Sequence, residues 1–336
     1  MRLFPRRLRR LLLPVELAAL VTLAAIFGAL ALVGFVAIPL DKARRLLRVA
    51  GFGLAYTLIE VGVLAAAGVV WLRHPRLGKP SGRDEVWVEA NRRLLAWALG
   101  SVLGAARACF GFEVEVEGPE HAAFGDPNPL LVLARHGGPG DSFALVYLLL
   151  TRYQRRVRIV VKEILAIDPA LDVLLNRLGC CFLPSGPPRG EALASRLAVA
   201  ARDLSRGDAL LVFPEGGNWT PKRRRRAIHR LRSERGAAAA RPAVLMTNVL
   251  PPRPAGVLAC LDARPDLGVV VVAHAGLDRL TSARQMWSGI PLSTKMRVRA
   301  WPAAAPPTGD EERKAWLTTE WATVDAWVDA CHSNPR

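Results

Sequence analysis

The chain contains too little cysteine, in too irregular a pattern, for a disulfide framework. It has five cysteines in 336 residues, and none of them forms a Cys-x-x-Cys pair. An odd number of thiols in mostly apolar surroundings predicts reduced core cysteines. Companions at metal-ligand spacing are also lacking around the histidines at 74, 121, 229, 274 and 332. We therefore expect these five to be surface or satisfied core residues, and we predict no metal site.

Acidic residues are scarce relative to basic ones. The chain has 29 Asp and Glu against 46 Lys and Arg, which gives a net charge of +17. Such an excess favours an anionic partner, either nucleic acid or an anionic membrane surface. The densest basic cluster, Lys222 to Arg226, has neither interleaved aromatic residues nor a zinc-ligand pattern. The sequence therefore favours anionic membrane lipids, and not nucleic acid, as the partner.

Long apolar runs, by contrast, are present near the N-terminus. Leu11 to Leu40 is almost unbroken, and Val49 to Leu72 carries only Glu60 as a charged residue. Both exceed the length of about 20 apolar residues with which a helix crosses the hydrocarbon core of a membrane. A cleaved signal peptide is the alternative for the first run, but that run is long and a second one follows it promptly. We expect a two-helix membrane anchor over residues 1–83 and a second domain over residues 84–336.

Basic residues flank these runs and predict their orientation. Five arginines fall in the first ten residues, and four basic residues lie between Arg73 and Arg83. Both ends therefore favour the cytoplasmic face of a cell inner membrane. The connection from Asp41 to Arg48 is basic as well, which favours a shallow or re-entrant hairpin. Since Glu60 would be costly facing lipid, we expect it to face the partner helix if the hairpin crosses fully.

A histidine and an aspartate stand at the end of an apolar, strand-like stretch. His136 and Asp141 are separated by Gly-Gly-Pro-Gly, which favours a tight turn that would fold the carboxylate beneath the imidazole. A neutral imidazole takes a proton from an attacking hydroxyl, and a carboxylate on its far nitrogen fixes the tautomer. The alternative is that Asp141 caps a helix from Ser142 to Leu150 while His136 is an ordinary strand-end residue.

A second apolar strand further along the chain ends in Phe-Pro-Glu-Gly, at residues 213–216. Together, in this order, the two elements resemble the glycerophospholipid (1-acylglycerol-3-phosphate) acyltransferase family, whose first motif is His-x4-Asp and whose third is Phe-Pro-Glu-Gly. The resemblance looks closest to the branch of lysophosphatidic acid and lysocardiolipin acyltransferases, and it covers roughly residues 90 to 330. It is also carried by residues 160–165, 218–220, 249–256 and 316–327.

The second motif of this family departs from its usual form. It normally reads Gly-x-x-Phe-Ile-x-Arg, and its arginine bears on the substrate phosphate. Here the sequence runs Gly-Cys-Cys-Phe-Leu-Pro-Ser from Gly179, so Ser185 stands where the arginine is expected. Arg189, four residues further on, is a candidate to replace it. The departure weakens the expectation of a simple phosphatidic acid pathway substrate.

Beyond the apolar runs, strand-like and helix-like segments alternate. This alternation predicts an α/β fold with a mainly parallel sheet flanked by helices, behind a helical membrane anchor. Strands are expected at 130–134, 157–161, 180–183, 209–213, 244–248, 269–273 and 296–301. Helices are expected at 85–108, which links the anchor to the sheet, and at 142–151, 169–178, 191–205 and 311–331.

The resemblance implies an O-acyltransferase that moves a fatty acyl group from acyl-coenzyme A, or from acyl carrier protein, to a hydroxyl of a lysophospholipid such as 1-acyl-sn-glycerol-3-phosphate. His136 would remove the hydroxyl proton and Asp141 would orient His136, with the thioester as co-substrate and no cofactor. The residues expected to bind substrate are Phe213, Pro214, Glu215, Gly216, Lys162, Arg189, Lys222 and Arg223.

Two other functions fit the same features. One is an acyltransferase that modifies a glycolipid or another hydroxyl acceptor, and the other is a catalytically silent membrane-binding protein. A covalent acyl-serine route fits poorly, because neither Ser142 nor Ser185 lies in a Gly-x-Ser-x-Gly elbow.

Overall fold

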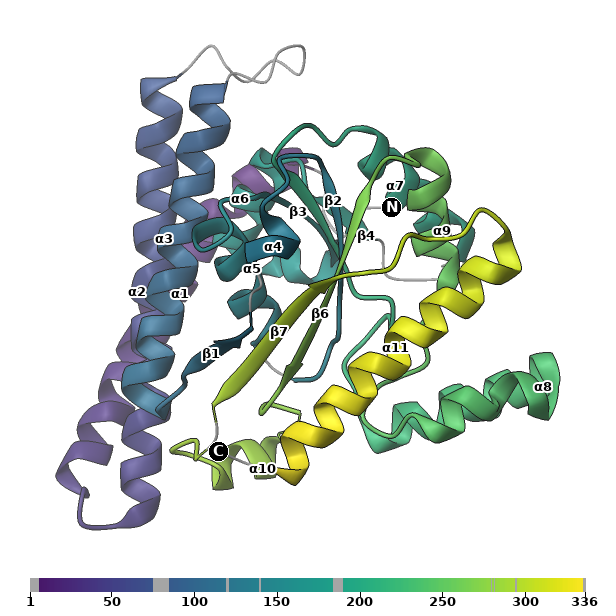
Figure 1. The fold of residues 1–336 in the computed structure, drawn as a ribbon. Helices are drawn as coiled ribbons and strands as arrows, with labels where there is room; N and C mark the ends of the chain where they lie inside the picture. Colours follow the sequence, from purple (N-terminus) through teal and green to yellow (C-terminus); the bar gives the residue numbers. More distant parts are fainter. Residues whose placement is uncertain are drawn as a thin grey trace. The chain divides into compact units, whose positions relative to one another are not determined.

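The chain packs as two compact units in the computed structural model, which describes residues 6–74, 85–118, 121–138, 140–183, 190–278, 280, 282–293 and 295–334 (Figure 1). The first unit comprises Met1–Phe112, Val160–Gly186 and Trp287–Ser293. The second comprises Glu113–Ile159, Pro187–Met286 and Thr294–Arg336. Two residues named in the sequence analysis, Ser185 and Arg189, lie outside the described residues.

Three long apolar helices begin the first unit. They are α1 (Arg6–Val36), α2 (Asp41–Arg73) and α3 (Glu85–Phe110), and α2 packs against both of the others. Each of the three contains a stretch long and apolar enough to cross a membrane. The two apolar helices predicted from the sequence are therefore present. The third candidate, α3, is the segment that the sequence predicted only as a link.

Glu60, the charged residue within the second apolar run, has a different partner from the one predicted. Glu60 is 6% exposed, and its carboxylate accepts a hydrogen bond of 3.1 Å from the N–H of Ala170. Ala170 lies in the first turn of α6 (Pro169–Arg177), which Asp168 caps. The first N–H groups of a helix lack partners within it and favour a negative charge. Glu60 therefore faces the start of α6, and not the partner helix.

A short parallel strand pair completes the first unit. Residues 160–162 of β3 (Arg156–Lys162) pair with β4 (Cys181–Leu183), and η1 (Glu163–Ile167) connects β3 to α6.

The second unit is built on a sheet whose strands run in the order β1-β7-β6-β2-β5-β3. Only β6 and β7 pair antiparallel, so the predicted mainly parallel sheet is confirmed. The central strands β2 and β5 are buried along their whole length, as strands covered on both faces should be. The sequence missed β1. The bounds are β1 (Val114–Glu117), β2 (Leu130–Ala134), β5 (Asp208–Val212), β6 (Gly268–Ala275) and β7 (Met296–Pro302).

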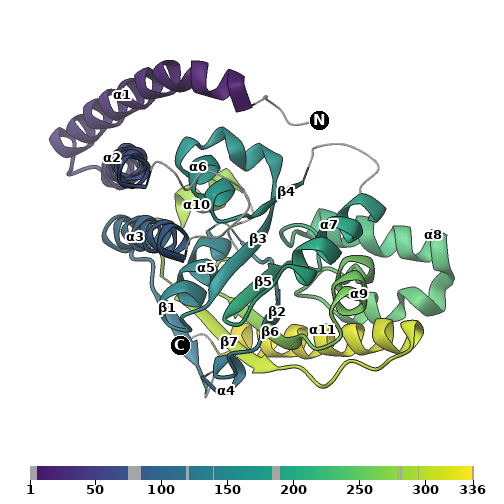
Figure 2. The ribbon, with the colours of Figure 1, turned by 90° about the horizontal axis from the view of Figure 1, so that it is seen from above.

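Helices flank this sheet (Figure 2), and α5 covers one face of it. Apolar side chains of α5, such as Leu145, line a small cavity together with Val132 of β2 and Val272 of β6. Because side chains alternate along a strand, Val132, Ala134 and the following His136 belong to the face toward α5. The helices are α4 (His121–Phe124), α5 (Asp141–Thr151), α7 (Gly190–Arg202), α8 (Pro221–Leu245), α9 (Pro254–Ala263), α10 (Ala283–Ser288) and α11 (Asp310–Ser333).

The strand predicted at residues 244–248 is wrong, because this segment ends helix α8. The helix bends sharply at Gly236, which has a φ of 83°. Beyond the bend the chain folds back, so that Arg224 donates to the carbonyls of Val244 at 2.7 Å and Met246 at 2.8 Å. A guanidinium at the end of a helix satisfies carbonyls that lack a partner. The short apolar run Ala-Val-Leu-Met did not distinguish a strand from a helix end.

Gly276, directly after β6, provides a test of the packing between this strand end and the start of β7. Its φ is 114°, and a Cβ here would overlap the carbonyl oxygen of Lys295. We expect Gly276→Ala to lower the free energy of unfolding by about 1–3 kcal/mol, measured by thermal unfolding followed by tryptophan fluorescence. The control is Gly190→Ala, where a Cβ would meet no atom within 4 Å. Equal stability of the two variants would contradict the expectation.

Candidate active site

The register of the parallel sheet brings the two sequence motifs together. Leu133 of β2 lies opposite Val212 of β5, so His136, three residues on, is level with Glu215. The backbone N–H of His136 donates to Oε1 of Glu215 at 3.2 Å. Both motifs follow the carboxyl ends of parallel strands, the edge where α/β sheets place their sites.

His136 and Asp141 form a hydrogen-bonded pair. The Nδ1 atom of His136 lies 3.0 Å from Oδ2 of Asp141. The aspartate is ionised at neutral pH and only accepts, so we assign the proton to Nδ1 and leave Nε2 as the basic nitrogen. The His136 side chain keeps 21% of its surface exposed, whereas that of Asp141 keeps 1%. Asp141 therefore orients the imidazole through Nδ1, and part of the ring remains accessible to solvent.

Glycines make the turn between the two residues possible. Gly140 has a φ of 80° and occupies the position that caps α5, a backbone conformation that glycine adopts without strain. A Cβ at Gly138 would lie 2.6 Å from the carbonyl oxygen of Leu277. Asp141 is thus the first residue of α5 and not its cap, contrary to the alternative reading. Its Oδ2 also accepts the N–H groups of Gly137 at 2.9 Å and Gly138 at 3.1 Å.

The surroundings of Asp141 keep it ionised. Burial of this carboxyl by itself favours the neutral form and raises the pKa. The hydrogen bond from His136 and the N–H of Gly138 act in the opposite direction and prevail, so the pKa falls to about 2. A carboxylate in the first turn of a helix is also favoured by the helix dipole.

Glu215 joins three backbone segments. Its side chain is 1% exposed, and its two oxygens accept the N–H groups of His136 and, at 2.9 Å, of Leu250. Burial raises the pKa of Glu215 to about 7, although nearby Arg135 and the two N–H groups favour the ionised form. The carboxylate thus supports the backbone of the site, and its predicted part in substrate binding stays a prediction.

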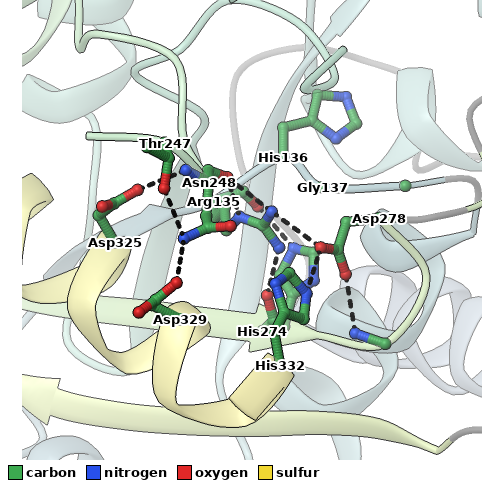
Figure 3. A network of polar contacts seen from close by, with 12 residues as sticks. Arg135, His136, Gly137, Thr247, Asn248, His274, Asp278, Asp325, Asp329 and His332 are labelled. Carbon is green, nitrogen blue, oxygen red and sulfur yellow. Dashed lines mark hydrogen bonds and ion pairs between the residues drawn. The ribbon is translucent and has the colours of Figure 1, made fainter. Parts of the chain in front are cut away.

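A buried polar network lies on the opposite side of the strand end from His136 (Figure 3). Arg135 is fully buried, and its guanidinium donates to the carbonyls of Asn248 at 2.7 Å and His274 at 2.6 Å. Asp278 lies 3.4 Å from this guanidinium and 2.7 Å from Nε2 of His332 on α11. A buried charge is costly unless it is paired and hydrogen-bonded, and these contacts supply both conditions.

The same network reaches α11 by a second route. The N–H of Asn248 donates to Asp325 at 2.6 Å, and its side-chain amide lies 3.5 Å from Asp329. The residue before His136 is therefore connected to the C-terminal helix through a chain of polar contacts.

The other predicted residues after β5 surround the pair. The ring of Phe213 lies 4.6 Å from that of His136, centroid to centroid. The carbonyl of Pro214 accepts the N–H of Arg253 at 2.9 Å, and the Arg253 guanidinium lies 3.2 Å from the place of a Cβ on Gly216. The N–H of Trp219 donates to the carbonyl of His136 at 2.8 Å.

Lys222 and Arg223 are exposed in the first turn of α8, and Arg223 donates to the carbonyl of Asn218 at 3.0 Å. Lys162 ends β3 in the first unit, but its side chain lies outside the part of the chain that the structure describes, as does Arg189. Within that part, no group of three or more His, Cys, Asp or Glu side chains is arranged to hold a metal ion.

Arg135 was missed by the sequence analysis, and His274 was expected there only as a surface or satisfied core residue. Arg135 directly follows the buried strand β2, and His274 lies near the end of β6, which is buried except at Gly268. A charged or polar residue at that position in two neighbouring strands is the signal that points to them. Their interaction, however, depends on strand order, which the sequence does not give.

Comparison with known proteins agrees with this geometry. Residues 113–252 match the family model described as Acyltransferase. The fold is similar to the crystal structure of the 1-acyl-sn-glycerophosphate (LPA) acyltransferase PlsC from Thermotoga maritima, with a TM-score of 0.56 and 16% identity. That similarity covers 88% of this chain and 100% of the other. No curated protein matches the chain.

The matched segment contains the His136/Asp141 pair, Glu215 and the strands that position them. This segment therefore resembles the acyltransferase family, and the fold of the chain is like that of PlsC.

Proposed function

We propose that this acyltransferase is membrane-bound and transfers a fatty acyl group from acyl-coenzyme A to a hydroxyl of a lysophospholipid such as 1-acyl-sn-glycerol-3-phosphate. The observation that supports the proposal most is the 3.0 Å contact between His136 and the buried Asp141, with the imidazole open on its other side. An oriented neutral imidazole is the group that acylation of a hydroxyl needs.

In the proposed reaction, Nε2 of His136 takes the proton of the acceptor hydroxyl as the oxygen attacks the thioester carbonyl. The carbon–sulfur bond then breaks, and the imidazolium returns its proton to the departing thiolate, which leaves as a free thiol. Asp141 stabilises the imidazolium between these steps. The N–H groups of Gly137 and Gly138 are taken by Asp141, so Gly217 is the candidate donor to the oxyanion. The reaction needs no cofactor besides its thioester donor.

Exposed cations beside the site are the candidates for phosphate recognition. Arg223 and Arg253 lie against the backbone of Gly217 and Gly216, and Lys222 adjoins Arg223. A guanidinium binds phosphate through two parallel hydrogen bonds. These residues, together with Lys162 and Arg189, would bind the phosphates of the acceptor or of coenzyme A. Acyl carrier protein is the alternative donor, and it would present a phosphopantetheine thioester to the same histidine.

A membrane location is part of the proposal. The three apolar helices would hold the chain in a cell inner membrane, with the sheet-bearing unit on the cytoplasmic face. Helix α8 would meet anionic headgroups, because within its bounds it has one acidic residue, Glu234, against many exposed cations. These cations are Lys222, Arg223, Arg225, Arg226, Arg230, Arg232, Arg235 and Arg241.

A different hydroxyl acceptor, such as a glycolipid, is the second candidate. The observation that favours it is Ser185, which stands where the related motif has its phosphate-binding arginine.

One prediction of the proposed function concerns catalysis. His136→Ala should lower kcat by about 10²–10⁴-fold, because no other base would take the hydroxyl proton, and Asp141→Asn should also lower kcat through loss of the correct tautomer. The assay follows thiol release from acyl-coenzyme A with a panel of lysophospholipids and glycolipids. The control is Asp266→Asn, whose carboxylate is 68% exposed. Full activity of His136→Ala would refute the mechanism, whereas acylation of a glycolipid alone would replace the proposed acceptor.

A second prediction concerns pH and Glu215. Its pKa is raised from 4.5 to about 7, so the folded state keeps a proton that the unfolded state has released. The resulting stability is fully present below pH 4.5 and is lost as pH rises through about 7. Glu215→Gln should therefore show a smaller fall in unfolding temperature between pH 5 and pH 8. Glu311→Gln, at an exposed carboxylate, should keep the wild-type fall; an unchanged fall in both variants would contradict the prediction.

A third prediction concerns α8. In lipid nanodiscs, an anionic composition should slow amide exchange in residues 221–245 relative to a zwitterionic one, and salt should reverse the effect. Since each basic residue near an anionic surface contributes about 1 kcal/mol, Arg226→Gln/Arg230→Gln should measurably reduce this protection. The control, Arg206→Gln/Arg284→Gln, removes two other exposed charges. Equal protection on both compositions would rule out α8 as a headgroup contact.

A further inference from the structure

A second histidine lies on the buried side of the catalytic pair. We propose that His274 is a positioning residue that holds Asp141 in place against His136, through its buried Nε2–H beside the carboxylate. The proposal rests on the acyltransferase function proposed above, and it assigns a role to a residue that the mechanism does not otherwise use.

The register of the sheet places His274 beside the pair. Ala134 of β2 lies opposite Val272 of β6, so His136 and His274, each two residues further on, are level with one another. Partner residues in parallel strands direct their side chains to the same face. Both histidines therefore belong to the face toward α5, where Asp141 begins the helix. The Nε2 atom of His274 lies 3.4 Å from Oδ2 of Asp141.

The tautomer of His274 follows from its other contact. Its Nε2 lies 2.8 Å from the carbonyl oxygen of Arg135, and a carbonyl only accepts, so Nε2 carries a proton. That N–H points at the Arg135 carbonyl, and Oδ2 of Asp141 lies beside the same nitrogen, 3.4 Å away. Burial lowers the pKa of His274 and outweighs the nearby carboxylate of Asp141. The imidazole is thus a neutral donor with its single N–H at this place.

The position of His274 is itself fixed by an exchange of hydrogen bonds with Arg135. The guanidinium of Arg135 donates to the carbonyl of His274 at 2.6 Å, while His274 donates to the carbonyl of Arg135. Asp278 and His332 extend this contact to α11 (Figure 3). His274 is 1% exposed, so the ring has no solvent into which it could turn. The ionisable groups that face it are Asp141, Arg135 and Asp278.

This arrangement explains how a single carboxylate oxygen is held so firmly. Oδ2 of Asp141 accepts hydrogen bonds from Nδ1–H of His136 and from the N–H groups of Gly137 and Gly138. Nε2 of His274 lies 3.4 Å from the same oxygen. A Cβ at Gly137 would lie 3.0 Å from Cε1 of His274, so the glycine also makes room for the ring. Without His274, Asp141 would be able to rotate away from His136, and a small misplacement of a catalytic group lowers the rate steeply.

The test compares two replacements of His274. His274→Gln keeps an N–H donor at about the position of Nε2, whereas His274→Leu fills the space without a donor. We expect the leucine variant to lose about 10²-fold in kcat at nearly constant KM, and the glutamine variant to retain most of the activity. Val270→Ala on the same buried strand is the control: it should lower the unfolding temperature and leave kcat nearly unchanged. Should the leucine variant fail to fold, His274→Asn, whose amide is too short to reach Asp141, replaces it.

A second measurement does not depend on acyl transfer. The proton on Nδ1 of His136, shared with Asp141, should give a strongly downfield NMR signal in protein labelled at histidine. This signal should persist in His274→Gln and disappear or move in His274→Leu. If the signal and kcat are unchanged in the leucine variant, or if both replacements lower kcat equally, His274 is only a core residue. If the wild type acylates no acceptor while the signal still responds to His274, the proposed function fails and the positioning role remains.

Discussion

The parallel pairing of β2 with β5 on one side and β6 on the other determines where every group of the site lies. His136, Glu215 and His274 are far apart in the sequence, but they stand at the same level, His136 and Glu215 just beyond the ends of β2 and β5 and His274 near the end of β6. A shift of register by one residue would turn each of these side chains to the opposite face of the sheet. The buried apolar residues of the three strands oppose such a shift. The same hydrophobic burial that stabilises the sheet therefore also aligns these three side chains.

The side chains of Arg135 and His136, which follow β2, point to opposite faces of the sheet, and only His136 is partly exposed. His136 faces α5, where one side of its ring is exposed, whereas Arg135 points the other way into a region closed to solvent. In such a region hydrogen bonds and ion pairs are strong, and an unpaired group is costly. Arg135 avoids this cost because its guanidinium donates to two carbonyls and lies beside the carboxylate of Asp278. His136 is thus attached to a backbone segment that the buried contacts of Arg135 hold in place.

Much of the fold, and the contact between His136 and Asp141, could be predicted from the sequence. Strands with continuous apolar residues, such as Leu130–Ala134, have a strong signal, and the Gly-Gly-Pro-Gly run correctly indicated the turn that brings Asp141 to His136. The segment at 244–248 was misjudged because a short apolar run is equally compatible with a helix end, and the guanidinium of Arg224 decided the outcome. The strand order was not predictable, and with it the contacts of Arg135 and His274.

The contrast between Asp141 and Glu215 shows how surroundings separate two buried carboxyl groups. Both are about 1% exposed and both accept backbone N–H groups. Asp141 also begins a helix and accepts a hydrogen bond from Nδ1–H of His136, and its pKa falls to about 2. Glu215 has no such partner, its burial prevails, and its pKa rises to about 7. At neutral pH Asp141 is therefore ionised beneath the imidazole, whereas Glu215 is only partly ionised, and in the proposed reaction the charge of Asp141 would stabilise the imidazolium that proton transfer creates.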